Sequence, residues 1–136
     1  MGLAREALQA SLRYTQERVQ FDRPLRDHPL VQSRIAGMFT RTHAARLLCV
    51  EASRQRDQGA CGAIGATMTA KYEAARAAVH VAGEALQLHG ANGFGAALSV
   101  QRLFRDAQVF ELIEGSTPIL QMLIAEHAYQ HGGEIE

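Results

Sequence analysis

Apolar and small side chains recur every three or four positions along most of this chain, which is the spacing that places them on one face of an α-helix. The first such stripe lies in residues 3–19 and comprises Leu3, Ala7, Leu8, Ser11, Leu12 and Thr15. Longer stripes with the same spacing follow at 29–57 and 60–88, and a shorter one at 99–110. The pattern therefore predicts a helix over each of these four stretches.

Prolines, glycines and charged residues mark the breaks between the stripes. Residues 20–28 contain a proline and several charges without a periodic stripe, so they are predicted to form an ordered loop. A last helix is predicted to begin with Thr117 as its N-cap and Pro118 at its first position, where proline is tolerated. Residues 132–136 are expected to fray.

The lengths of the predicted helices indicate the fold. Two of them have about 28 residues each, and at about 1.5 Å per residue each spans about 40 Å. Helices of this length suit an antiparallel bundle, so the sequence predicts an all-α fold, an antiparallel four-helix-type bundle that forms one domain over residues 1–136. Small residues cover more than one face of the third helix, so we expect this helix to be packed on several sides or to form a subunit interface.

Composition argues against several classes of function. The formal net charge is +0, so no basic face for nucleic acid or an anionic membrane is predicted. No apolar stretch reaches the roughly 18 residues of a membrane span, and a cytoplasmic protein is expected. Cys49 and Cys61 are too few for a disulfide scaffold and are predicted to pack as small apolar side chains. The six histidines lack paired ligand spacing, so no metal site is predicted.

Glu114 is the most pointed candidate for chemistry. It lies between two apolar residues and the pair Gly115-Ser116, just before the predicted last helix. Burial beside apolar groups would raise the pKa of its carboxyl toward working pH and make it a usable base. The same position also suits an ordinary acid that interacts with the dipole of the final helix. The residues alone favour neither role.

Two further stretches have the composition of ligand-contacting loops. The glycine-rich stretch 90–95 follows a helix, whereas a dinucleotide fingerprint follows a strand, so it is either a helix stop with a tight loop or a place where backbone approaches a ligand closely. Arg13, Arg18 and Arg23 flank the first loop. A guanidinium fork there suits a phosphate, although surface arginines are commoner than ligand arginines.

Four motifs, in order, resemble the acyl-CoA dehydrogenase family. Residues 17–25, ERVQFDRPL, look like its signature ER-x-QFG-x-PL, and residues 84–93, EALQLHGANG, are similar to its ALQ-hydrophobic-x-GG-x-G loop. Residues 100–107, VQRLFRDA, match its V-x-RL-aromatic-RDA helix, and residues 110–117, FELIEGST, its I-x-EGT turn. The resemblance covers residues 2–127 and corresponds to the C-terminal third of a typical member, whose N-terminal helical and middle β-domains have no counterpart here.

The resemblance implies an FAD-dependent dehydrogenase of acyl thioesters. It assigns to Glu114 the role of the base that takes the substrate's α-proton while the β-hydride passes to the flavin. Ser116 stands where the family usually has a threonine hydroxyl near the cofactor.

The resemblance also implies a set of contacts to FAD held by a neighbouring subunit. Arg18 and Phe21 match the residues that contact the pyrophosphate and adenosine parts, and Gln87, Gly90 and Ala91 match a further patch against the same cofactor. A homo-oligomer, either a dimer or a tetramer, is therefore expected.

Departures from the family pattern limit these expectations. Asp22 replaces the usual glycine and adds a negative charge near the implied pyrophosphate site, and Pro118 replaces a glutamine whose amide contacts FAD in relatives. Short strings look more like dehydrogenases of polyketide extender-unit pathways, which act on acyl carrier protein rather than CoA. A separate chain that supplies the missing domains is one reading, and a non-catalytic oligomerisation or scaffold bundle is the alternative. The chain alone is expected to bind FAD poorly.

Overall fold

The computed structural model describes residues 1–131, and the tail expected to fray, 132–136, lies outside the described residues. Within that range the α-helices are α1 (Gly2–Glu17), α2 (Pro29–Asp57), α3 (Ala63–His89), α4 (Val100–Val109) and α5 (Thr117–Gln130). Between them lie the short strands β1 (Val19–Gln20) and β2 (Arg23–Pro24) and the 3₁₀-helices η1 (Leu25–Asp27) and η2 (Gly90–Phe94). The predicted all-α fold is confirmed.

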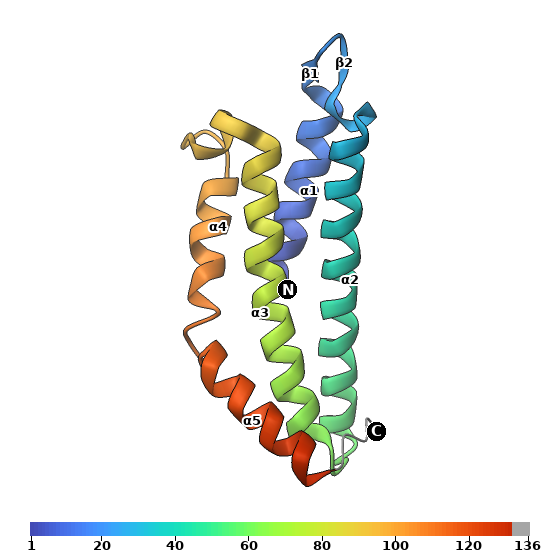
Figure 1. Cartoon of the computed structure of the whole chain (residues 1–136), viewed down its shortest axis with the longest axis vertical. Helices are drawn as coiled ribbons and strands as arrows, with labels where there is room; N and C mark the ends of the chain where they lie inside the picture. The colour runs from blue at the N-terminus through green and yellow to red at the C-terminus, as the bar shows by residue number, and fades with distance from the viewer. Residues whose placement is uncertain (132–136) are drawn as a thin grey trace.

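Helix α3 is the central element of the bundle. It contacts α1, α2, α4 and α5, and Figure 1 shows α2 and α4 on opposite flanks of it, each antiparallel to it, with α5 beside its lower half. The architecture is the predicted antiparallel four-helix-type bundle, extended by α5. No helix within residues 1–131 has the length and hydropathy needed to cross a membrane.

Small side chains let the neighbouring helices approach α3 closely. Its buried residues are Gly65, Ala70, Ala75, Ala77, Ala78, Val81, Ala82, Ala85, Leu86, Leu88 and His89. Larger side chains from the partners, including Met38 from α2 and Leu103 from α4, fill the space beside them and are almost fully buried. The prediction that the third helix is packed on several sides is confirmed.

The buried face of α1 contains two hydroxyl groups that are satisfied within the helix. Ser11 Oγ donates to the Ala7 carbonyl at 2.9 Å, and Thr15 Oγ1 donates to the Ser11 carbonyl at 2.8 Å. Because these bonds remove the cost of burying a free hydroxyl, α1 packs a partly polar stripe against the core.

Several local predictions are wrong in detail. Residues 20–28, predicted as a loop, contain β2, part of β1 and η1, and the two strands pair antiparallel with Val19 opposite Pro24. The N-cap of α5 is Ser116, and Thr117 is the first helical residue. Cys61 is exposed rather than packed. Helix α3 begins at Ala63, three residues later than predicted.

Helix α5 is held to the bundle by few contacts. Leu120 is its buried residue, and the Gln121 side chain donates to the Tyr72 hydroxyl on α3 at 3.1 Å. Further along, His127 lies directly over Gly65, where a Cβ atom would overlap its ring. A Cβ atom at position 65 would therefore force the His127 ring to move.

Two glycine-to-alanine substitutions test this packing. Gly37 lies inside α2 with no atom within 4 Å of the position of a Cβ, so Gly37→Ala is expected to raise the free energy of unfolding by about 0.5–1 kcal/mol. Gly65→Ala is expected to lower it, because the alanine displaces the His127 ring. Denaturant unfolding of both variants measures the difference, and equal stabilisation by the two would contradict the close approach.

Candidate functional site

Glu114 lies at the apex of a turn that joins α4 to α5. Its φ is 54° and that of the following Gly115 is 93°, so both residues occupy the left-handed region. A Cβ at Gly115 would approach Leu120 Cδ2 to 3.3 Å, so the turn packs tightly on the buried residue of α5. For a residue other than glycine this backbone conformation costs about 1–2 kcal/mol, which the surrounding contacts must offset.

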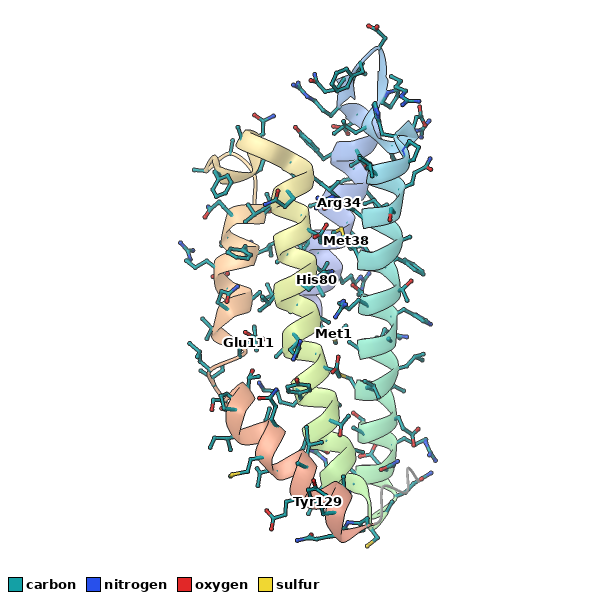
Figure 2. All side chains as sticks on the ribbon, viewed as in Figure 1. Met1, Arg34, Met38, His80, Glu111 and Tyr129 are labelled. Carbon is teal, nitrogen blue, oxygen red and sulfur yellow. The ribbon has the colours of Figure 1, made fainter. Side chains whose placement is uncertain are left out.

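Both ends of this turn are anchored by hydrogen bonds. The carbonyl of Phe110, the C-cap of α4, accepts a bond from Lys71 Nζ of α3 at 2.5 Å. The next carbonyl, that of Glu111, accepts from the Thr117 amide at 2.9 Å and from Thr117 Oγ1 at 3.3 Å. Figure 2 shows Glu111 at the lower end of α4, beside this turn.

The Glu114 side chain is exposed, and within residues 1–131 its carboxylate has no hydrogen bond or ion pair. The first turn of α5 contains no acidic residue, because Glu114 precedes the N-cap Ser116 by two positions. The alternative of a structural acid in the first turn of the last helix therefore has no support from the geometry. Ser116, half-buried, makes no capping bond with its side chain.

Four of the six residues expected to contact FAD line one hollow at the opposite end of the bundle. This hollow of about 280 Å³ lies between the end of α1 and the end of α3. Its lining includes Arg18, Gln87, Gly90 and Ala91. The backbone at Gly90 is open, with no atom within 4 Å of the position of a Cβ. The Arg18 side chain and the accessible backbone of Gly90 thus line the same hollow.

Three side chains that were not predicted as site residues hold the wall of this hollow. The ring of Tyr14 stacks on that of His89 with centroids 4.2 Å apart. The Tyr14 hydroxyl accepts from Asn92 Nδ2 at 3.0 Å and donates to the His89 carbonyl at 3.4 Å. These contacts join residues 75 and 78 positions apart, so no periodic pattern in the sequence marks them.

The tip of the β1–β2 hairpin carries Phe21, another of the expected cofactor residues. Phe21 and Asp22 have φ values of 53° and 61°, which is the pattern of a type I′ turn. The Phe21 side chain is 88% exposed and meets the His28 ring edge-on at 6.1 Å. The hairpin therefore presents an aromatic ring on the surface of the domain.

The expected site residues form two separate groups. One group, at the end of the bundle where α3 finishes, comprises Arg18, Phe21, Gln87, Gly90 and Ala91. The other, Glu114 and Ser116, lies in the segment between α4 and α5, which Figure 1 shows beside the lower half of α3 and whose Phe110 end is bonded to Lys71. At about 1.5 Å per residue, Lys71 and the C-terminal end of α3 are separated by roughly 27 Å along the helix. No group of three or more histidine, cysteine, aspartate or glutamate side chains within residues 1–131 is arranged to hold a metal ion.

Comparison with known proteins identifies the family. Residues 1–129 match the protein family "Acyl-CoA dehydrogenase, C-terminal domain". The chain belongs to the acyl-CoA dehydrogenase family. The resemblance found in its four motifs is thereby confirmed.

Relatives of this acyl-CoA dehydrogenase domain are found by sequence and by structure. It is 37% identical to glutaryl-CoA dehydrogenase of Desulfococcus multivorans over 125 residues, which are 92% of this chain and 32% of that protein. The structure of butyryl-CoA dehydrogenase from Megasphaera elsdenii superposes with a TM-score of 0.91 at 29% identity, over 94% of this chain and 33% of the other.

A third similar structure is that of FkbI, for biosynthesis of the methoxymalonyl extender unit of the polyketide Fk520. It has a TM-score of 0.85 at 35% identity, over 95% of this chain and 34% of that one. The domain therefore spans about a third of the length of the relatives it matches.

The residues of the hollow and hairpin fit FAD as their cofactor. A guanidinium fork at Arg18 suits a pyrophosphate, the open backbone at Gly90 allows close approach, and the exposed Phe21 ring suits an adenine face. Asp22 is the unfavourable element, because it adds a negative charge to the hairpin tip that carries Phe21.

Substitution of Asp22 tests the strain at this hairpin. Asp22→Gly is expected to raise the free energy of unfolding by about 0.5–1 kcal/mol, because glycine adopts a φ of 61° without steric cost. Asp22→Asn removes the same charge but keeps a Cβ, so it serves as the control and is expected to gain less. Thermal unfolding of the two variants measures this, and a larger gain for asparagine would contradict backbone strain as the cause.

The buried imidazole of His89 makes stability depend on pH. Burial lowers the pKa of His89 from its usual 6.5, and the hydrogen bond of Nδ1 to the Ala85 carbonyl opposes this only in part. The unfolded chain therefore binds the proton more readily, so stability is fully present above about pH 6.5 and falls as the pH drops toward the lowered pKa.

We expect the domain to lose more unfolding free energy between pH 7 and pH 5 than a His89→Gln variant, by at most about 1.4 kcal/mol per pH unit. Denaturant titrations of both proteins at the two pH values measure the difference. Equal losses of unfolding free energy in the two proteins would show that the pH dependence does not come from the His89 imidazole.

Proposed function

We propose that this domain is part of a flavin-dependent dehydrogenase of acyl thioesters and that Glu114 is its catalytic base. The observation that carries the proposal is the turn itself, which presents an unpaired glutamate in a left-handed conformation between two anchored helix ends. Its carboxylate is accessible from outside the domain, and we propose that segments other than residues 1–131 shield it from water when substrate is bound.

The proposed reaction uses Glu114 to remove the proton on the α-carbon of the thioester. When bound, FAD would supply the two-electron acceptor for the hydride lost from the β-carbon, so that loss of the α-proton to Glu114 yields the α,β double bond. Ser116, two residues away, is proposed to direct its hydroxyl toward the cofactor, because that hydroxyl makes no capping bond in α5.

The cofactor contacts are proposed to be shared between subunits. The hollow at Arg18 and the Glu114 turn lie at different levels of α3, so one flavin in contact with both would have to span the bundle. Two copies of the chain would remove this difficulty. The hairpin of one copy would contact a flavin, and Glu114 of the other copy would reach the substrate bound beside that same flavin. Exposed apolar side chains on α2, among them Phe39, Leu47 and Val50, provide surface for a homo-oligomer, either a dimer or a tetramer.

The acyl carrier remains a choice between CoA and acyl carrier protein. Names of relatives such as glutaryl-CoA dehydrogenase favour CoA, whereas the likeness to FkbI favours the polyketide extender-unit group. The segments that complete the enzyme are proposed to belong to the same polypeptide or to a separate chain. The rival function, a non-catalytic oligomerisation or scaffold bundle, rests on the exposed apolar surface of α2.

Substitution of the base tests the proposal in the assembled, FAD-loaded enzyme. Glu114→Gln is expected to lower the rate of flavin reduction by an acyl thioester by about 10²–10⁴-fold, because the amide cannot accept the α-proton. Flavin binding is expected to persist, whereas residues 1–136 alone are expected to bind FAD poorly. Stopped-flow absorbance of the flavin under anaerobic conditions measures the rate.

Glu126→Gln is the matched control, since this exposed glutamate on α5 interacts with Gln130 of the same helix. It is expected to leave the rate within about twofold of the original. A Glu114→Gln enzyme that reduces its flavin as fast as the control would remove the assigned role and favour the scaffold function.

A further inference from the structure

Lys71 is the one lysine of this chain, in which the other thirteen basic residues are arginines. It lies in the N-terminal half of α3, half-buried, and its ammonium bonds to the carbonyl of Phe110, the C-cap of α4, 39 residues away in sequence. Most of the arginine interactions are of another kind. Arg54 and Arg102, for example, form exposed ion pairs with carboxylates on their own helices.

The space around Lys71 allows its side chain to extend from α3 to the Phe110 carbonyl. The side chain lines a hollow of about 360 Å³ with Ala74, Ala75, Ala78 and Phe110 on one side, and another of about 490 Å³ with Thr67 and Ala70 on the other. Because the α3 residues that line these two hollows are small, they leave room for the stem of Lys71 to reach α4. A compact ammonium with rotatable donors fits a single carbonyl, whereas the wider guanidinium is suited to paired acceptors.

The bond meets a specific need at the end of α4. The last carbonyls of a helix lack intrahelical partners and carry the negative end of its dipole, so a cation that donates a hydrogen bond there stabilises the terminus. Phe110 is the C-cap of α4, and four residues later comes Glu114 in its left-handed turn. Lys71 therefore holds the carbonyl at the α4 end of the segment that leads into the turn.

We propose that Lys71 is a positioning residue for Glu114, and this inference rests on the proposed function of that glutamate. The ammonium fixes the Phe110 end of the turn to α3, while Thr117 fixes the Glu111 carbonyl to the start of α5. These two contacts to α3 and α5 thereby fix the position of the Glu114 backbone. A displacement of about 1 Å in a reacting group lowers a rate by about 10²-fold, so this anchor bears on turnover without touching substrate.

The first test is amide hydrogen exchange on the full chain, which needs no cofactor. In Lys71→Met the hydrogen-bonded amides of Leu112, Ile113 and Thr117 are expected to exchange about tenfold faster, while those of α1 keep their rates. Lys71→Arg is expected to restore only part of the protection, because it keeps the charge and donors but replaces the compact ammonium with a wider guanidinium. Arg102→Met, which removes a cation from α4 without contacting the turn, is the control.

Exchange results that contradict the proposal are equally specific. Unchanged protection of the turn in Lys71→Met would show that the bond anchors nothing. Faster exchange spread evenly over α1, α2 and α3 would show a general structural role, and the proposal would fail in that case as well.

The second test is turnover by the assembled, FAD-loaded enzyme. Lys71→Met is expected to lower kcat by about tenfold or more, with KM within about twofold, and Lys71→Arg to recover part of the loss. A Lys71→Met enzyme with full kcat, beside an inactive Glu114→Gln enzyme, overturns the inference and leaves the proposed function intact. An active Glu114→Gln enzyme overturns the proposed function and with it the role of Lys71.

Discussion

Close packing against the small side chains of α3 is the constraint on which the rest of the molecule depends. Alanines such as Ala75, Ala78 and Ala82 leave room for α1, α2 and α4 to pack against this one helix, and larger groups such as Met38 and Leu103 fill the gaps between them. A longer side chain at these positions would push one partner away. Because every other helix takes its place from α3, the two candidate site regions do so too.

Helix α3 supports the two candidate site regions at different places along its length. The C-terminal end of α3 carries Gln87 and His89 at the wall of the hollow, while Lys71, lower on the same helix, anchors the turn that holds Glu114. Neither region encloses a ligand, since the hollow is open and the glutamate is exposed. The proposed function therefore requires other protein segments to complete both regions, and the domain matches about a third of the length of each relative.

The sequence predicts the helices where its local chemistry is unambiguous. Helix α2 begins at Pro29 and ends at Asp57 as predicted, because proline suits a first turn and Gly59 adopts a φ of 66° just beyond the helix. The hairpin was missed since its tip is Phe21-Asp22, whereas the sequence signal of such turns is Asn-Gly. Ser116 and Thr117 are both good caps, so the pattern could not choose between them.

Contacts between distant residues account for what the sequence left out of the site. Lys71 and Tyr14 each bond to a partner 39 or more positions away, and spacing along the chain carries no record of such pairs. Lys71 is the one lysine beside thirteen arginines, which sets it apart in the sequence, but this does not indicate which residue it contacts. The motif resemblance did select residues that share the hollow, although their cofactor contacts stay predictions.

Backbone strain gives an independent reason to treat both regions as functional. Within residues 1–131 the non-glycine residues with positive φ are Phe21, Asp22 and Glu114, and all three lie in the hairpin or in the turn. Glycine or asparagine would adopt these positive φ values at lower energetic cost. The backbone conformation by itself therefore does not explain why a phenylalanine stands at position 21 or a glutamate at position 114. Such strain persists where a side chain is needed in a direction that an ordinary backbone does not provide. For Glu114, which caps no helix and pairs with no cation in the described chain, that direction is outward, away from the other described residues, as the proposed role of its carboxylate requires.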